Sequence, residues 1–340
     1  MSNRQITIAV DAMGGENSPF KILKGSEIFL MNNKNVNLLF FGNSKKIEDI
    51  IKKNNLNLSN YEIIDCLENV SDDDKPNTIL RSRKDSSIYK GLKFVKDNPN
   101  SGFVSAGNTA ALMILSRLIL GMIPGVDRPA ICSDIPNRKS FSLMLDLGAN
   151  VLVDASNLFQ FALMGYSYFS IIEPQRIPKI GIINIGTENN KGLEFLQEAH
   201  EILSNSFLKN NFVGFIEPHK ITSGDCDIIL SDGYTGNIIL KTAEGLSDFI
   251  TTNLRNIFKK SYKNKIAFKL LENDFKIFKD KINPDKYNGA TLIGLNGISI
   301  KSHGRASPYA FNFALNKCFN IINNDLNEKI IQNFRNLWLH

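Results

Sequence analysis

Short runs of apolar residues recur along the chain, and stretches with a helical spacing of apolar positions lie between them. The runs are nearly continuous in apolar character, which is typical of strands buried on both faces of a parallel sheet. They lie at residues 5–10, 37–41, 62–66, 103–106, 142–146, 179–185 and 227–231. Helices are expected to begin near residues 19, 110, 193 and 238. The alternation predicts a mostly parallel sheet with helices on both faces.

No Pro-, Ser- or Gly-rich linker divides the 340 residues, and the chain contains no internal repeat. The polar segment at 68–77 is typical of an exposed loop. A chain of this length can bury a large core. We therefore expect a single domain over residues 1–340.

Clusters of polar residues and glycine follow the predicted strands. Ligands of open α/β sheets bind beyond the carboxyl ends of the strands, so repeated clusters there indicate a functional site. One Gly-Asn pair alone is typical of an ordinary turn. We expect the clusters to lie on the same side of the sheet. They are 11–19, 105–109, 145–150, 184–192, 231–237, 295–297 and 302–304.

The first cluster combines Asp11, at a strand end, with a tight turn at Gly14 and Gly15. Ser18 and Pro19 then supply an N-cap and a first helical residue. Backbone N–H groups in such a turn point outward and suit an anion. The spacing matches neither a dinucleotide fingerprint nor a nucleotide P-loop, so it predicts a different anion.

Composition excludes several classes of protein. With 43% apolar and 22% charged residues, the chain resembles an ordinary soluble globular protein. We expect no secretory signal before the first strand, and the apolar stretch at 110–123 is too short to span a bilayer. The four cysteines are scattered, which predicts neither a disulfide framework nor a zinc site and favours the reducing cytoplasm. They are Cys66, Cys132, Cys226 and Cys318.

Taken together, the motifs resemble those of the bacterial phosphate acyltransferases from about residue 5 to about residue 320. The resemblance rests on AVDAMGGENSP (9–19), RKDSS (83–87), SAGNTAAL (105–112), DRPAI (127–131), LDLGAN (145–150), NIGTENNKG (184–192), residues 214–245 and GLNGISIKSHG (294–304). One position departs from the family pattern: Arg305 follows Gly304 where small residues are usual.

The resemblance implies a doubly wound, three-layer α/β/α sheet related to the isocitrate and isopropylmalate dehydrogenases and to phosphate acetyltransferase. It also implies an activity: acyl transfer from acyl carrier protein to inorganic phosphate, the entry step of phospholipid synthesis. The expected partners are acyl carrier protein, phosphate, a second copy of the chain and the inner face of the cell membrane, with a glycerol-3-phosphate acyltransferase downstream. Neither a metal, a cofactor nor nucleic acid is expected.

Phosphate needs no strong general base to attack a thioester, so the enzyme has to position two polar partners and stabilise the oxyanion. Lys191 is the leading candidate for a cation at the phosphate or the oxyanion. Asn108 is expected to donate from a helix start or to cap that helix. Asp232 either orients Lys191 or a water molecule, or braces its turn. His303 protonates the leaving sulfur, binds phosphate, or is structural.

The other residues expected to bind phosphate or substrate lie in the same loops as these four. They are Asp11, Gly14, Gly15, Gly107, Thr109, Asp146, Asn150, Gly186, Thr187, Gly233, Thr235, Gly236 and Asn237.

Positive charge is concentrated in one segment. Residues 254–286 contain nine Lys and one Arg against four acidic residues, which equals the net charge of +6 of the whole chain. A nucleic-acid binder more often has a wider basic face. Apolar residues in the segment step by three and four, as on one helix face: Phe268, Leu271, Phe275, Phe278 and Ile282. The dense lysines favour a protruding helix on the membrane surface; docking of acyl carrier protein, or packing on the core or a dimer partner, are the alternatives.

Several alternatives remain at this point. Cys226 is a candidate for a covalent acyl-enzyme, although it lies at the head of a strand, where cysteine is usually a small buried hydrophobe. Other functions are a phosphate acetyltransferase-like enzyme that uses acyl-coenzyme A, a dehydrogenase of the related fold, and a non-catalytic acyl-phosphate sensor at the membrane.

Overall fold

The computed structural model describes residues 5–68, 70, 83–281 and 283–337; the predicted loop at 68–77 lies mostly outside them. Its strands are β1 Ile6–Asp11, β2 Val36–Gly42, β3 Tyr61–Asp65, β4 Ser101–Ser105, β5 Ala130–Pro136, β6 Phe141–Leu145, β7 Ile180–Ile183, β8 Phe212–Ile216, β9 Ile228–Leu230, β10 Ala290–Ile293 and β11 Ile298–Lys301. Its α-helices are α1 Phe20–Asn32, α2 Ser44–Lys53, α4 Ser87–Asp97, α5 Thr109–Leu120, α6 Ala155–Ile172, α7 Glu194–Asn205, α8 Gly233–Lys259, α9 Tyr262–Leu270, α10 Glu272–Lys281, α11 Pro308–Asn323 and α12 Leu326–Leu337.

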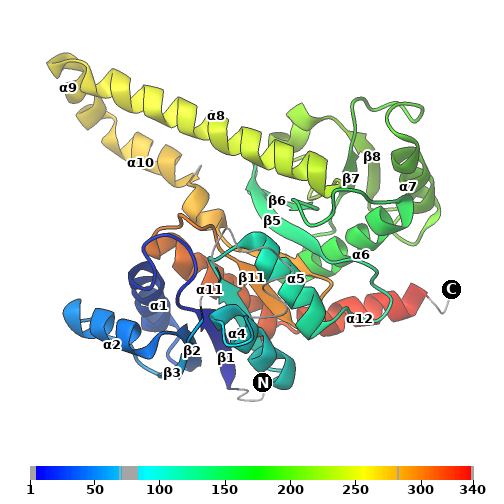
Figure 1. Ribbon diagram of the computed structural model, residues 1–340. Helices are drawn as coiled ribbons and strands as arrows, with labels where there is room; N and C mark the ends of the chain where they lie inside the picture. Colours follow the sequence, from blue (N-terminus) through cyan, green and yellow to red (C-terminus); the bar gives the residue numbers. More distant parts are fainter. Residues whose placement is uncertain (1–4, 69, 71–82, 282, 338–340) are drawn as a thin grey trace.

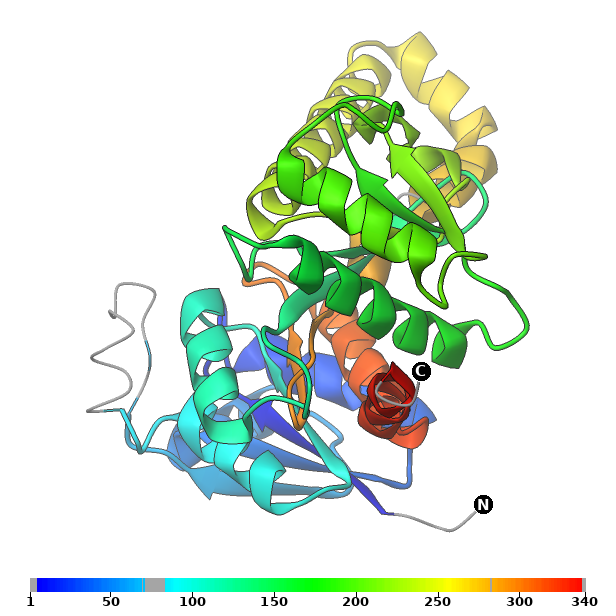
Figure 2. The same ribbon diagram turned by 90° about the vertical axis from the view of Figure 1, so that its right-hand side faces the viewer.

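The described strands form one sheet in the order β3-β2-β1-β4-β11-β10-β5-β6-β9-β7-β8. Strands β1 to β4 and β11, with their helices, form what we call the first half of the molecule. Strands β6 to β9, with α6, α7 and α8, form the second half, and β10 and β5 join the two (Figures 1 and 2). Because β10 and β11 come late in the sequence, the chain returns to complete the first half.

Strand direction differs between the halves. Neighbouring strands are parallel within each half, but β11–β10, β10–β5 and β5–β6 are antiparallel pairs. The three reversals make β6 to β9 run opposite to β1, β4 and β11. The expectation that all glycine and polar loops follow strand ends on the same side of the sheet is therefore wrong. The turn at 295–297, moreover, joins β10 to β11 at the other end of these strands from His303.

Alternating strand residues bury both faces of the sheet. Ile8 and Val10 of β1 belong to the core that includes α1 and α11, whereas Ala9 packs with α4 and α5 on the opposite face. In the second half, Leu145 packs in the α6 core and Met144 packs on the face near the start of α8. The expected three α/β/α layers are confirmed.

A helical hairpin, α8 to α10, protrudes from the second half (Figure 1). Helix α8 begins at Gly233 instead of near Ile238, because the Asp232 side chain caps it. The apolar positions with a spacing of three and four do not lie on one helix, because α9 ends at Leu270 and α10 begins at Glu272. Ile282, the last of them, lies outside the described residues.

Candidate functional site

Asp11 is buried at the end of β1 and joins three elements of the first half. Its carboxylate accepts hydrogen bonds from Ser87 Oγ at 2.6 Å, from Ser105 Oγ at 2.7 Å and from Met13 N at 3.1 Å. Ser87 begins α4 and Ser105 ends β4. These hydrogen bonds give the Asp11 carboxylate a structural role: it fixes the loop that follows β1.

Three loops meet above this brace. A Cβ on Gly14 would lie 2.5 Å from both Asp11 Oδ2 and Gly107 N, so the loops after β1 and β4 pack without room for a side chain. Gly15 has a φ of +80°, and a Cβ there would lie 2.8 Å from the carbonyl oxygens of Ala106 and Gly304. The loop after β11 thus joins the other two. We call the meeting of residues 14–16, 106–108 and 303–305 the triple-loop site.

Asn108 and Thr109 start α5 beside this site. The Asn108 side chain accepts a hydrogen bond from Ala111 N at 2.8 Å, so the predicted capping role is observed. Thr109 is exposed. The positive end of the α5 dipole and its first-turn N–H groups suit an anion.

His303 is held by its own loop and by Asn288. Its backbone N donates to Asn288 Oδ1 at 2.9 Å, and its ring Nδ1 accepts from Arg305 N at 3.1 Å. An accepting Nδ1 leaves the proton of the neutral ring on Nε2. Burial lowers the pKa of His303, against the opposing effect of Glu244 on α8. His303 is therefore a neutral donor near pH 7, and it lies within electrostatic reach of the hairpin.

Asp146 plays the bracing role in the second half. Its carboxylate accepts from the backbone N of Ile131, Gly148, Ala149 and Asn150 at 2.6–3.1 Å and from the Asn150 side chain at 2.9 Å. Complete burial raises its pKa, although these hydrogen bonds oppose the shift. Asp146 and Asn150 thus shape the loop after β6.

The first turn of α8 lies on that loop. A Cβ on Gly233 would lie 2.6 Å from Asn150 O, and one on Gly236 would lie 1.9 Å from Asp146 O. Asp232 accepts from both Thr235 N, at 2.8 Å, and Thr235 Oγ1, at 2.6 Å. Of the two roles expected for Asp232, the contacts match the bracing role.

Asn237 ends this first turn with an exposed side chain. An added Cβ on Gly148 would lie 3.6 Å from Asn237 Cβ.

Lys191 lies in the loop after β7. Its Nζ contacts Glu188 Oε1 at 2.7 Å, and both side chains are about half exposed (48% and 56%). The buried Asn184 fixes the loop by donating to Lys191 O at 2.9 Å and accepting from Ile185 N at 2.8 Å. Gly186 is buried beneath the Lys191 side chain, and Thr187 is exposed. Within the part of the chain that the structure describes, the ammonium itself is held only by this exposed ion pair.

One apolar cluster receives side chains from both α5 of the first half and α8 of the second half. Met113 of α5 and Ile239 and Leu240 of α8 pack against the same buried apolar cluster, which includes Ile183 at the end of β7. The starts of α5, α8 and the Lys191 loop therefore surround one apolar cluster. Among the described residues, however, no hydrogen bond or ion pair links Lys191 to Asp232, Asn108 or His303.

The described cysteines are buried as free thiols. Burial raises the pKa of Cys226 to about 12, and its Sγ donates to Ile228 O at 3.0 Å. Since the thiolate is the nucleophilic form, this environment disfavours an acyl-enzyme on Cys226. Nowhere in the described ranges do three His, Cys, Asp or Glu side chains come together as a metal site would require.

Three phenylalanines of the hairpin pack against one another, although Phe268 remains 40% exposed. Ring centroids are 5.2 Å apart for Phe258 and Phe268, 4.7 Å for Phe258 and Phe275, and 5.6 Å for Phe268 and Phe275. Leu271 and Phe278 remain exposed by 46% and 44%. Phe275 is thus a packing residue of the hairpin, whereas Leu271 and Phe278 are available at its surface.

Sequence reasoning missed two polar residues that contact the triple-loop site. Asn288 orients the backbone of His303 and also donates to Ser302 Oγ at 2.9 Å. Lys21 is buried in the first turn of α1, and its Nζ donates to Gly304 O. The sequence could have indicated burial of Lys21 by one feature: this lysine directly precedes the apolar residues Ile22 and Leu23, which are buried.

Comparison with known sequences gives one family and many relatives. Residues 6–329 match the model of a family described as "Fatty acid synthesis protein". The phosphate acyltransferase of Clostridium tetani is 39% identical over 328 residues, covering 95% of this chain and 98% of the relative. That of Pelagibacter ubique is 40% identical over 332 residues, covering 96% and 98%.

Solved structures show the same fold at low identity. A phosphotransacetylase from Streptococcus pyogenes superposes with a TM-score of 0.60 at 17% identity, covering 97% of this chain and 94% of the other. The EutD phosphotransacetylase from Staphylococcus aureus gives 0.58 at 16% identity, with coverages of 98% and 95%. The expected likeness to phosphate acetyltransferases is therefore confirmed for the fold.

Proposed function

Because this chain belongs to the phosphate acyltransferase family and is therefore an acyltransferase enzyme, we propose that it transfers an acyl group from the thioester of acyl carrier protein to inorganic phosphate. The acyl phosphate serves phospholipid synthesis, with a glycerol-3-phosphate acyltransferase as its consumer. The observation that supports this most is the triple-loop site, where glycine backbone meets the N-terminus of α5. Such a place suits a phosphate.

In the proposed reaction a phosphate oxygen attacks the thioester carbonyl carbon. The new C–O bond forms, the C–S bond breaks, and the proton of hydrogen phosphate goes to the leaving thiolate. A thiol has an ordinary pKa near 8.5, so its departure needs little assistance. Lys191 exchanges Glu188 for the phosphate or the developing oxyanion, and the neutral His303 donates a hydrogen bond from Nε2. Asn108 and Thr109 add donors at the start of α5.

Direct attack requires no thiol of the enzyme. The high pKa of Cys226 supports this route over an acyl-enzyme. Cys226→Ala should therefore keep most of the activity. Mass spectrometry of the enzyme mixed with acyl carrier protein thioester, without phosphate, should give no adduct; a stoichiometric adduct on Cys226 that phosphate removes would establish the two-step route.

Hydroxylamine trapping tests the activity. The purified chain is incubated with acyl carrier protein thioester, and acyl hydroxamate is measured with and without phosphate. A phosphate-dependent product supports the proposal. Faster turnover of acetyl-coenzyme A than of the long-chain carrier thioester would favour the phosphate acetyltransferase alternative. Binding of acyl phosphate without any turnover would favour the sensor.

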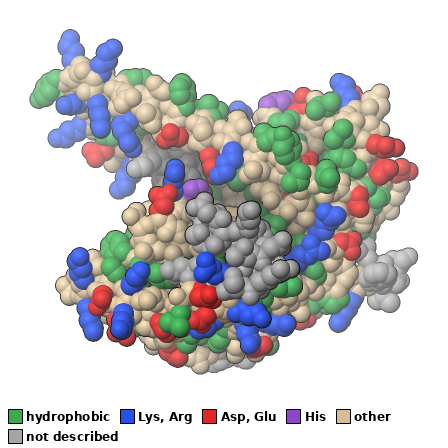
Figure 3. All heavy atoms as spheres, viewed as in Figure 1, with side chains coloured by type: hydrophobic (Ala, Val, Ile, Leu, Met, Phe, Trp, Pro, Cys, Tyr) green, Lys and Arg blue, Asp and Glu red, His purple; other side chains and the backbone are tan. Residues whose placement is uncertain are grey.

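We also propose that the hairpin brings a homodimer of the enzyme to the inner face of the membrane. Lys and Arg side chains gather with apolar ones at its far end (Figure 3). Each cation near an anionic surface contributes about 1 kcal/mol to binding. Helix α8 also exposes Leu246, Phe249 and Ile250, which a second copy would cover. No described helix combines the length and apolar character of a membrane span.

Flotation with anionic vesicles tests the membrane contact. Phe278→Glu should abolish flotation and leave turnover of a short-chain thioester unchanged, whereas Phe275→Glu should destabilise the hairpin because Phe275 packs within it. Binding to neutral vesicles, or binding that salt does not weaken, would contradict the proposal. Lysine-dependent binding of acyl carrier protein without vesicle binding would assign the basic tip to that partner.

A further inference from the structure

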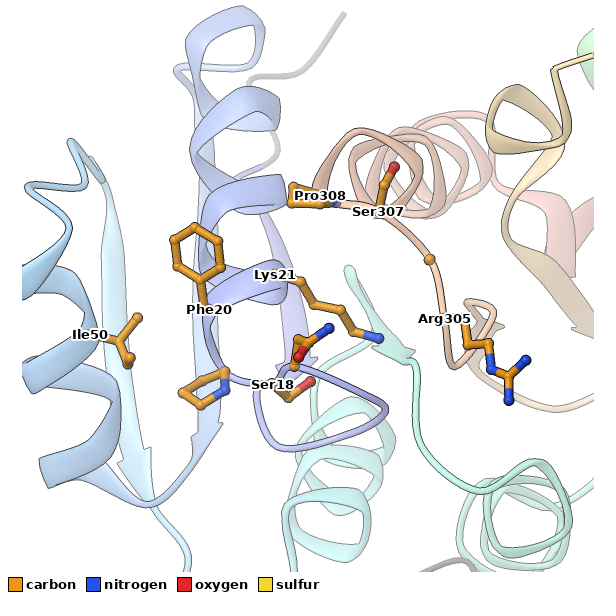
Figure 4. Close-up of a pocket in the computed structure, with 10 residues that line it drawn as sticks. Ser18, Phe20, Lys21, Ile50, Arg305, Ser307 and Pro308 are labelled. Carbon is orange, nitrogen blue, oxygen red and sulfur yellow. The ribbon is translucent and has the colours of Figure 1, made fainter. Parts of the chain in front are cut away.

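Lys21 is a buried lysine directly beneath the triple-loop site. Its side chain lies on the first turn of α1 and is 4% exposed. Its Nζ donates to Gly304 O, and a Cβ on Gly15 would lie 2.7 Å from this nitrogen. Figure 4 shows the Lys21 side chain extending from α1 toward the segment that carries Arg305. The ammonium therefore lies between the glycine turn and the loop of His303.

This is an unfavourable place for a cation. Lysine is rarely buried unless paired, and the first turn of a helix is the positive end of its dipole. Burial lowers the pKa of Lys21, and Glu16 acts in the opposite direction. Glu16, however, is shared with Arg305, whose Nε lies 2.8 Å from Glu16 Oε1. Glu16 alone does not pair with both cations, and the Asp11 carboxylate below the turn already accepts from Ser87 Oγ, Ser105 Oγ and Met13 N, so an anion at the turn would offset the remaining positive charge.

Lys21 also acts on the geometry of the site. The Gly304 carbonyl accepts from Lys21 Nζ and, at 3.0 Å, from Glu16 N. These bonds hold the loop after β11 against the loop after β1. Gly304 lies between His303 and Arg305, which are themselves joined through Nδ1 of the imidazole. A shift of the Gly304 carbonyl would therefore turn the His303 ring.

We propose that Lys21 is a positioning residue for inorganic phosphate, which keeps the triple-loop site closed through Gly304 and makes it electropositive. This inference rests on the proposed function, since it names Lys21 as a determinant of phosphate affinity at the same site. Its action should fall on phosphate and spare the acyl donor.

Steady-state kinetics separates these effects. Lys21→Met should raise the KM for phosphate roughly tenfold or more, as expected for the loss of a charged hydrogen bond. The KM for the thioester should stay within about twofold, and Lys21→Arg should recover part of the phosphate affinity. The matched control is Lys45→Met, which removes the same charge from the exposed surface of α2. An unchanged KM for phosphate in folded Lys21→Met, or a parallel rise of both KM values, would overturn the proposal.

If Lys21→Met does not fold, the pH dependence of the phosphate affinity of Lys21→Arg tests the proposal. The pKa of Lys21 is lowered, so the wild type should lose phosphate affinity at alkaline pH, while the arginine variant keeps it. The titratable and charged neighbours are Glu16 on its own loop and His303 and Arg305 on the facing loop. Ile50 of α2, and Ser307 and Pro308 at the start of α11, bring no charge. Identical alkaline profiles of wild type and Lys21→Arg would reject the proposal.

Binding without turnover distinguishes this proposal from the proposed function. Inorganic phosphate, compared with chloride at equal ionic strength, should raise the Tm of the wild type more than that of Lys21→Met. If Lys21→Met does not fold, the rise of the wild-type Tm should be larger at neutral than at alkaline pH. A wild type that is stabilised by phosphate but makes no acyl phosphate would refute the activity and keep the role of Lys21. If the wild type makes acyl phosphate but phosphate stabilises the wild type and Lys21→Met equally, the activity is supported and the role of Lys21 is refuted.

Discussion

The two halves of the molecule hold their candidate site residues in different ways. In the first half, Asp11, Gly14 and Lys21 are buried, Asp11 accepts a hydrogen bond from Ser105 Oγ, and Lys21 Nζ donates to Gly304 O. In the second half, the Lys191 backbone is fixed by Asn184, but among the described residues its ammonium pairs only with the exposed Glu188. Buried polar contacts are costly to break, whereas an exposed ion pair contributes little stability. The first half is thus preorganised, and the second half offers a cation that can exchange its partner.

The largest effect is expected at Lys191. Lys191→Ala should lower turnover by roughly 10²–10³, the usual loss for one electrostatic group in an active site. The free energy of unfolding should hardly change, because the side chain is half exposed. Lys209→Ala, at another exposed lysine of the second half, is the control. Turnover within about threefold of the wild type would remove Lys191 from the mechanism.

His303 should come next. His303→Ala should lower turnover up to about 10²-fold, and His303→Gln, which keeps an N–H donor, should lose less. Because burial lowers the pKa of His303, its neutral form persists through neutral pH and is lost only as the pH falls below the ordinary value of about 6.5. Protonation of Nδ1 would break the hydrogen bond that it accepts from Arg305 N and would disturb this loop. At a fixed concentration of hydrogen phosphate dianion, turnover of the wild type should therefore be flat from that ordinary pKa value to about pH 8, with an acid limb that His303→Gln abolishes. An acid limb that persists in His303→Gln would assign it to another group.

A smaller effect on activity, with a loss of stability, is expected at Gly14. In Gly14→Ala the new Cβ meets Asp11 Oδ2 and Gly107 N at 2.5 Å, which should cost about 1–3 kcal/mol of the free energy of unfolding. Gly245→Ala in α8 is the matched control, because nothing lies within 4 Å of its Cβ. That control should gain up to about 1 kcal/mol. Urea denaturation measures the free energy of unfolding of both variants. If Gly14→Ala were as stable as the wild type, the loops after β1 and β4 would have room for the added methyl group.

The smallest effect is expected at Glu188. Glu188→Gln should change the free energy of unfolding by less than about 0.5 kcal/mol, because both members of its ion pair are exposed. Turnover should stay equal or rise slightly, since Lys191 no longer has to leave a carboxylate. A loss of turnover as large as that of Lys191→Ala would mean that the ion pair itself is the working unit, and the contrast between the halves would fail.

The sequence predicts the strands better than their directions. Apolar runs locate β1, β2, β3, β4, β6, β7 and β9 to within a few residues. A strand that is buried on both faces has a continuous apolar run whichever way it points. The apolar pattern therefore cannot predict that the strand pairs around β10 and β5 are antiparallel. The expectation of loops at one edge of the sheet failed for this reason.

The candidate site and the hairpin show a similar limit. Glycine turns and strand-end aspartates are local signals, and Asp11 and Gly14 do meet at the triple-loop site. Lys21 reaches Gly304 across 283 positions of sequence, a contact that no local pattern contains. In the hairpin, the spacing of Phe268 and Phe275 continues across the break at Leu271, because no glycine or proline marks it.

The position of β11 has a consequence for synthesis of the protein on the ribosome. The strand pairs with β4, yet residues 106–297 must be translated between them. A nascent chain that ends before residue 298 lacks the strand that seats His303 and Gly304, although β1, β2 and β4 can already pair. The first half therefore stays open along one edge until the last eighth of the chain emerges. Anion binding should appear only at that final stage of elongation.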